Sequence, residues 1–140
     1  MQVYPIPNTA LPIRLTLPMQ AMRVACGFPS PADDHLDQAL DLNCHLISNP
    51  AASYFVRAEG DSLKDIGICS GDLLIVDRSH KAKHGDVVIA AADGQLLCKI
   101  LDLKCNALVA ANTHYPPIHI TSDMNLVIEG VVIHAIHHLR

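Results

Sequence analysis

The chain has 140 residues, half of them hydrophobic. This length is enough for one domain with a hydrophobic core but is short for two domains. Its net charge is −4 and its ten lysines and arginines are scattered, so we do not expect direct DNA binding, which needs a basic stripe. Five cysteines without C-x-x-C spacing favour neither a disulfide framework nor a zinc ribbon. No stretch reaches the roughly 20 apolar residues of a membrane span, and prolines interrupt any signal peptide. A cytoplasmic protein without membrane contact, metal or cofactor is therefore expected.

The first 31 residues alternate prolines with short apolar pairs. Proline cannot continue a helix, and it pushes the preceding residue toward extended backbone. We therefore predict an extended N-terminal arm over residues 1–31 and a β-rich domain over residues 32–140. Such an arm can still enter a cleft as a strand. Apolar residues near helical spacing, behind two carboxylates, predict a short amphipathic helix between residues 32 and 47: Leu36, Leu40, Ile47, Asp33 and Asp34.

The remainder of the chain is rich in β-strand signals. Runs of Val, Ile and Leu bounded by glycine-bearing turns predict strands over residues 54–58, 73–77, 86–92, 95–101, 108–111 and 126–136. Asp93-Gly94 is typical of a type I′ hairpin, because both central positions of that turn need a positive φ. No long helical stretch separates the strands. The prediction is a mostly β, largely antiparallel and partly closed fold, in preference to α/β.

Ser62 is a candidate nucleophile because Gly60-Asp61-Ser62 directly follows the predicted strand 54–58. Its hydroxyl would then stand at a strand end. Most serines in such turns only hydrogen-bond the turn, so the position alone is a weak signal. The G-x-S-x-G elbow of α/β-hydrolases is not met, since Lys64 stands where the second glycine belongs. A base for Ser62 must come from elsewhere in the chain.

Lys99 is the unusual lysine, because apolar residues flank it on both sides. Burial disfavours a charged ammonium, and a neutral amine can accept a serine proton. A lysine that reaches solvent from an edge strand is the simpler alternative. Lys64 is the rival base, although Asp65 beside it favours a solvated, paired lysine. The other three lysines lie in polar surroundings: Lys81, Lys83 and Lys104.

Two other site types are less favoured. His134, His137 and His138 could suggest a metal, but a strand would place position 137 on the face opposite 134 and 138, so no metal site is expected. A cysteine peptidase that uses Cys98 or Cys69 is also conceivable. Buried roles as small hydrophobic residues are commoner for such cysteines.

Several blocks together resemble, in order and spacing, the UmuD proteins and the C-terminal domain of LexA-type repressors: Tyr54-Phe55-Val56, Gly60-Asp61-Ser62, the run from Gly71 to Asp77, the run from His84 to Ala90, Asp93-Gly94 and Lys99. The resemblance extends from about Cys26 to Arg140. It implies a LexA/signal-peptidase-like β-fold and a self-cleaving serine–lysine peptidase, with Ser62 as nucleophile and Lys99 as base. The implied scissile bond joins Cys26 to Gly27, and the implied oxyanion hole consists of the backbone N–H groups of Asp61 and Ser62. Leu63 stands where the family usually has methionine.

The same resemblance implies a role in the SOS response to DNA damage. A RecA filament on single-stranded DNA would stimulate self-cleavage, and the trimmed homodimer would be an accessory subunit of an error-prone, UmuC-type Y-family translesion polymerase. Only 25 residues precede Cys26, which leaves no room for the helix-turn-helix domain of a repressor and favours the UmuD-like interpretation. A repressor-type regulator without that domain and a catalytically silent dimeric interaction module are the alternatives.

Overall fold

The structure, a computed structural model, describes residues 1–5, 15–20, 26 and 36–140. Most of the predicted arm lies outside these residues, as do Gly27 and the predicted helix caps Asp33 and Asp34. The chain divides into two compact units. The larger unit joins Met1–Asn8 to Asn49–Arg140, and the smaller unit is Thr9–Ser48. The first residues of the predicted arm therefore belong to the β-rich unit.

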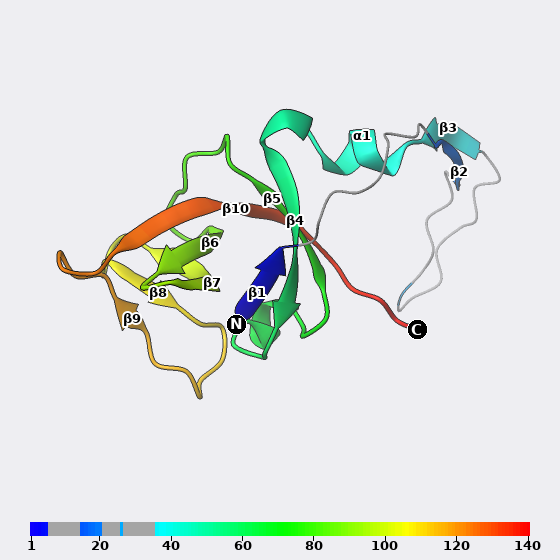
Figure 1. Ribbon diagram of the computed structural model, residues 1–140. Helices are drawn as coiled ribbons and strands as arrows, with labels where there is room; N and C mark the ends of the chain where they lie inside the picture. The colour runs from blue at the N-terminus through cyan, green and yellow to red at the C-terminus, as the bar shows by residue number, and fades with distance from the viewer. Residues whose placement is uncertain (6–14, 21–25, 27–35) are drawn as a thin grey trace. The chain divides into compact units, whose positions relative to one another are not determined.

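The described part of the larger unit contains one eight-stranded sheet, whose strands we label as in Figure 1. Its strands are β1 (Gln2–Pro5), β4 (Ser53–Glu59), β5 (Leu73–Asp77), β6 (Val87–Ala92), β7 (Gln95–Asp102), β8 (Ala107–Val109), β9 (Ile118–His119) and β10 (Leu126–Ile136). Two short 3-10 helices, η1 (Pro50–Ala52) and η2 (Lys64–Ile66), flank β4. All six predicted strands are confirmed, with small differences at their ends.

The sheet closes on itself. Its strand order is β1-β4-β5-β10-β6-β7-β8-β9, and β1 also pairs with β7 through Gln2 and Leu97. Every pairing within it is antiparallel. Figure 1 shows β1 lying beside β4. The predicted mostly β, antiparallel, partly closed fold is thus confirmed, and the closing strand is the start of the chain.

Two backbone features fix the sheet's shape. Asp93 and Gly94 have φ values of 48° and 82°, so the predicted type I′ signal between β6 and β7 is confirmed. The long strand β10 pairs first with β6 and then with β5, and its register with β6 shifts between Ile128 and Gly130. A Cβ at Gly130 would lie 2.5 Å from Cγ1 of Val76. Glycine is required there because β10 passes so close to β5.

The core of the barrel begins with the first residue of the chain. Met1 and Val3 are buried in one cluster with residues of β4, β5, β6 and β7: Val56, Ala58, Leu74, Val76, Ile89 and Cys98. Leu63, directly after the candidate nucleophile, is fully buried in the same cluster. A second cluster contains Val88, Ala90, Leu101, Leu108 and Val131. Along β6, Ile89 faces the first cluster and its neighbours Val88 and Ala90 face the second, so this strand is buried on both faces.

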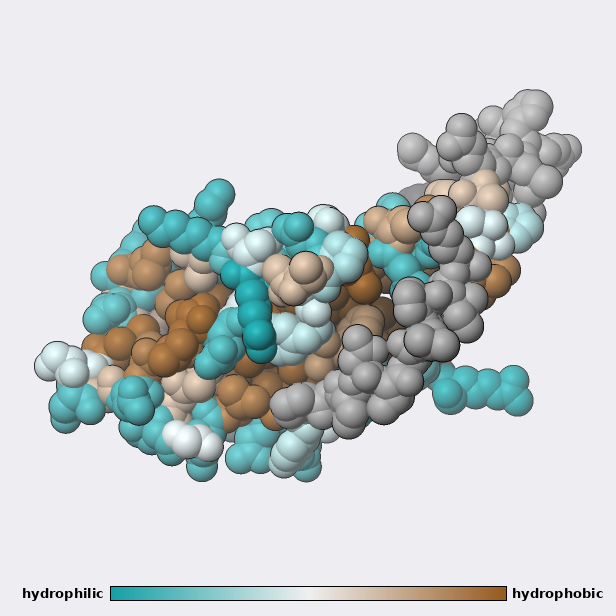
Figure 2. All heavy atoms as spheres, turned by 45° about the horizontal axis from the view of Figure 1, so that its top comes forward, coloured by the Kyte–Doolittle hydropathy of each residue, from teal (hydrophilic) through white to brown (hydrophobic). Residues whose placement is uncertain are grey.

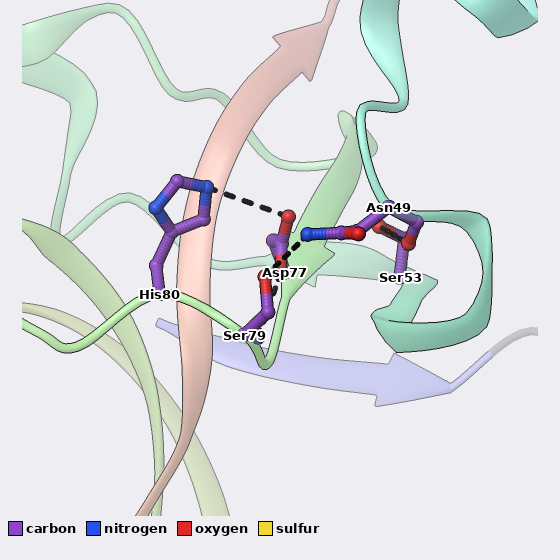
Figure 3. A network of polar contacts seen from close by, with 5 residues as sticks. All are labelled: Asn49, Ser53, Asp77, Ser79 and His80. Atoms are coloured by element: carbon purple, nitrogen blue, oxygen red, sulfur yellow. Dashed lines mark hydrogen bonds and ion pairs between the residues drawn. The ribbon is translucent and has the colours of Figure 1, made fainter.

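A polar network holds the end of β5 (Figure 3). Asp77 is fully buried, and its Oδ1 accepts hydrogen bonds from the backbone N–H and the hydroxyl of Ser79, at 2.7 and 2.5 Å. Asn49 donates to the same hydroxyl at 2.8 Å, and His80 lies 3.4 Å from Oδ2 of Asp77. The Ser79 hydroxyl is the main reason that the pKa of the Asp77 carboxyl lies below its ordinary value.

The smaller unit corrects the predicted helix. Leu36 and Leu40 lie in a strand, β3 (Leu36–Leu40), which pairs with β2 (Leu17–Gln20). The helix α1 spans only Leu42–Leu46 and begins after Asp41, whose carboxylate accepts from the Asn43 N–H at 3.0 Å. The prediction was wrong because sheet pairing with a distant segment outweighed weak local periodicity.

None of the described helices is long and apolar enough to cross a membrane.

Candidate active site

The candidate nucleophile follows β4 through a glycine. Gly60 has a φ of 101°, a conformation that side chains disfavour, and it lets the chain turn sharply after Glu59. Ser62 is fully buried, and its carbonyl accepts a hydrogen bond from the Ala111 N–H at 2.7 Å. The hydroxyl of Ser62 therefore stands at the end of a strand, as predicted, but is covered from solvent.

Lys99 lies in β7, opposite Val88 of β6. Its side chain is only 5 % exposed, which agrees with the apolar run around it and excludes the solvent-reaching alternative. The ring centroid of Tyr115 lies 5.1 Å from Nζ of Lys99, within the range of a cation–π contact. In contrast, Lys64 is exposed, as are the other three lysines that were predicted to lie in polar surroundings.

The amino group of Met1 brings the two candidate residues together. It donates a 2.5 Å hydrogen bond to Oγ of Ser62. Its pKa is lowered from 8.0 to about 6, first by burial and then by the positive charge of Lys99. One buried amine thus contacts the hydroxyl of Ser62 and is close enough to Lys99 to be repelled by its charge. A substrate atom placed there would meet both side chains.

The segment after β8 holds the turn that carries the nucleophile. Asn112 is buried and donates through Nδ2 to the Asp61 carbonyl at 3.0 Å. The Tyr115 hydroxyl donates to Oδ1 of Asp61 at 2.6 Å, and this bond is the main reason that the pKa of the Asp61 carboxyl is lowered and that of Tyr115 is raised. Because a peptide group is planar, fixing the Asp61 carbonyl also fixes the direction of the Ser62 N–H. That N–H is one of the two implied oxyanion donors.

The alternative of a cysteine peptidase is not supported by the state of the cysteine thiols. Burial raises the pKa of the Cys98 thiol to about 12, so the thiol carries its proton at neutral pH. Cys69 is partly buried and lies in the turn before β5. Cys98 packs in the core as a small hydrophobic residue.

His137 behaves differently from the other two histidines of the C-terminal group. Its Nδ1 lies 2.6 Å from Oδ1 of the buried Asp72, whose Oδ2 accepts from the Cys69 N–H. Ligand atoms of Cys69, Asp72 and His137 lie within 4.8 Å of one another, so these three side chains could hold a metal ion. His134 and His138 are exposed. Both oxygens of the Asp72 carboxylate thus have partners, Nδ1 of His137 and the Cys69 N–H.

Only one of the two residues of the predicted cleavage site is among the described residues. Cys26 is exposed, and Gly27 lies outside the described residues.

Three site residues were not predicted from the sequence: Met1, Asn112 and Tyr115. Met1 and Val3 alternate with Gln2 and Tyr4, which is a strand signal but a very short one. Asn112 and Tyr115 sit in a polar turn, where sequence alone does not distinguish a site residue from a turn residue.

Comparison with known proteins places this geometry in a family. The model of the family described as Peptidase S24-like matches residues 18–133. The chain belongs to that family. It is 45% identical over 123 residues to Protein ImpA of Salmonella typhimurium, which covers 88% of this chain and 85% of that protein. It is 37% identical over 123 residues to Protein MucA of Escherichia coli, with 86% and 84% covered. The predicted UmuD-type membership is therefore confirmed.

A repressor also matches. The chain is 36% identical over 140 residues to the LexA repressor of Shewanella denitrificans, and the match covers 91% of this chain but 67% of the repressor. The higher identity to ImpA agrees with the predicted preference for the UmuD-type branch of the family.

Proposed function

We propose that this protein is a self-cleaving serine peptidase of the SOS response, with Ser62 and Lys99 as a catalytic dyad that cuts between Cys26 and Gly27. The observation that carries the proposal is the position of the two side chains. Both are buried, and the Met1 amine that contacts Oγ of Ser62 is repelled by the charge of Lys99. Membership of the Peptidase S24-like family adds support.

The proposed reaction is acyl transfer followed by hydrolysis. Once Lys99 has lost its own proton, its amine accepts the proton of the Ser62 hydroxyl as Oγ attacks the carbonyl carbon of Cys26. The backbone N–H groups of Asp61 and Ser62 stabilise the negative charge that develops on the carbonyl oxygen. The protonated lysine then gives its proton to the departing amine of Gly27. Water finally hydrolyses the acyl ester on Ser62 by the same proton route.

We further propose the cellular role. A RecA filament on single-stranded DNA would favour the cleavable conformation, and the trimmed homodimer would serve a UmuC-type Y-family polymerase in translesion synthesis in the cytoplasm. Self-association is supported by large apolar side chains that the larger unit exposes, among them Phe55, Ile66 and Leu103. Figure 2 shows hydrophobic side chains lying among hydrophilic ones on one face of this unit.

The decisive experiment is incubation of the purified chain at raised pH, followed by mass spectrometry of the intact products. The expected result is a fragment that begins at Gly27, and its absence from the Ser62→Ala protein. A chain that stays whole both at raised pH and with RecA, nucleotide and single-stranded DNA would instead be a catalytically silent interaction module. A fragment that begins at another residue would refute the proposed scissile bond.

A further inference from the structure

β1 lies between β4 and β7 and pairs with both, and we call the space that it fills between these two strands the groove. In β1, Val3 lies opposite Ala58 of β4, and Gln2 lies opposite Leu97 of β7. The carbonyl of Met1 accepts a hydrogen bond from the Cys98 N–H at 2.9 Å. Met1 and Val3 point inward, with 6 % and 3 % of their surface exposed, whereas Gln2 and Tyr4 are exposed. β1 therefore binds the groove as an added strand, through both its backbone and alternate side chains.

The occupied groove ends at the candidate dyad. The Met1 amine hydrogen-bonds Oγ of Ser62, and a Cβ on Gly60 would lie 3.6 Å from Cα of Met1. With β1 in place, Ser62 is 0 % and Lys99 is 5 % exposed. A carbonyl carbon must approach Oγ closely to be attacked. While Met1 holds this position, a substrate carbonyl has no place beside Ser62.

We propose that the groove between β4 and β7 is a binding site for an extended peptide strand, that Met1–Pro5 occupies it at rest, and that the segment to be cleaved must displace β1 to reach Ser62. The competition rests on the proposed self-cleavage, whereas the occupancy stands on the strand pairing alone. The ligand is an extended segment with small or apolar side chains at alternate positions, because β1 buries Met1 and Val3 there. β1 has four residues, and the segment Met1–Pro5 has two buried anchors, Met1 and Val3, so it can be exchanged without unfolding the rest of the sheet.

The first test measures occupancy without any catalysis. In a Ser62→Cys background, the thiol at position 62 is alkylated with iodoacetamide and quantified by peptide mass spectrometry, which separates it from the native cysteines. Adding Val3→Asp places a carboxylate in an apolar site and should speed alkylation at least roughly tenfold. The matched control is Val127→Asp, which makes the same change at a strand valine that is 51% exposed and lies in β10. It should leave the alkylation rate unchanged.

Two further measurements distinguish release of β1 from partial unfolding of the whole barrel. Val3→Ala should give a smaller increase in alkylation with a folded circular dichroism spectrum. A synthetic peptide with the sequence of Met1–Pro5, added to the Val3→Asp protein, should restore slow alkylation, and the same peptide with aspartate at its third position should not. Equal alkylation in all variants, or no protection by the peptide, would overturn the proposed occupancy.

The second test measures competition in chains that retain Ser62. Val3→Asp should increase the rate of cleavage between Cys26 and Gly27 at least severalfold, and Val127→Asp should not. If the thiol at position 62 is released but a cleaving protein cuts no faster, β1 does not compete with the cleaved segment and the proposal falls. If the thiol is released and no variant cleaves, the strand-binding groove is supported and the proposed peptidase function fails.

Discussion

Replacing Asn112 by alanine tests whether the segment after β8 orients the proposed oxyanion donor. The substitution removes the 3.0 Å bond from Nδ2 to the Asp61 carbonyl and the 3.1 Å bond that Oδ1 accepts from the His114 N–H. The Asp61 carbonyl keeps a weaker partner, the Lys64 N–H at 3.2 Å. The carbonyl is then not orphaned, but the peptide group that carries the Ser62 N–H can rotate.

The expected effects on stability and rate differ in size. Loss of a buried side-chain hydrogen bond costs about 1–2 kcal/mol of stability. Removal of one oxyanion donor in a serine peptidase costs roughly 10²–10³ in rate, and a misdirected donor should cost a part of that, about tenfold to a hundredfold. The pH dependence of self-cleavage should keep its shape, because Asn112 neither gives nor takes the transferred proton.

The assay compares self-cleavage rates by mass spectrometry with thermal unfolding by circular dichroism. Asn49→Ala is the control, because it removes a 2.8 Å side-chain hydrogen bond of another asparagine, to Ser79 at the end of β5. Both variants should lose stability, and only Asn112→Ala should lose rate. Asn112→Asp should also be slow, since a carboxylate cannot donate to the Asp61 carbonyl. Equal rates for Asn112→Ala and Asn49→Ala would refute the positioning role.

Three further predictions follow from the dyad, the β5 network and the Met1 amine. Lys99→Ala should abolish self-cleavage in a folded protein, and wild-type-like cleavage would remove Lys99 as the base. Ser79→Ala should lower the melting temperature at pH 7, and the difference should shrink below pH 3.8, because the pKa of Asp77 is depressed in the folded chain and its stabilisation is lost as the carboxylate is protonated. Docking of β1 should strengthen by up to about tenfold per unit between pH 6 and 8, since the amine of Met1 has a pKa of about 6 when docked against 8.0 when free. The methyl resonance of Met1 in NMR spectra should move toward that of a free methionine as the pH falls from 8 to 6, and a pH-independent resonance would contradict this.

The charged groups around the Met1 amine decide the sign of that last effect. Burial disfavours the protonated amine and Lys99 repels it, while the carboxylate of Asp61 acts in the opposite direction more weakly. Below pH 6 the amine is protonated both docked and free, so docking carries the full penalty. Above pH 8 it is neutral in both states, and docking is strongest.

The β-rich part of the fold could be predicted because its signals are local. Strands β5 and β10 were predicted with the ends that the structure has, since each is rich in Leu, Val and Ile. The Asp93-Gly94 turn needed only its own dipeptide. The burial of Lys99 could be predicted from its apolar neighbours in the same strand. In each case the deciding residues are adjacent in the chain.

The helix between residues 32 and 47 failed for the opposite reason. Its few apolar positions fit a helix only loosely, and the deciding partner, β2, lies about 20 residues earlier. The contact of Asn112 and Tyr115 with Asp61 spans more than 50 residues, and no local pattern announces it. Such pairings depend on which segments the closed sheet brings together.

The first strand, β1, could be predicted in part from its alternation of side chains. Met1, Gln2, Val3 and Tyr4 alternate inward and outward, as a half-buried strand requires, and the prediction of an arm able to enter a cleft was compatible with this. What the sequence could not supply is the order of the sheet. β1 lies next to β4 and β7 because those two strands leave the gap that closes the barrel. Since the same two strands lead to Ser62 and carry Lys99, any segment that closes this gap also covers the candidate dyad. Closure of the barrel by β1 and access to Ser62 are therefore opposed, and a change that weakens one should favour the other.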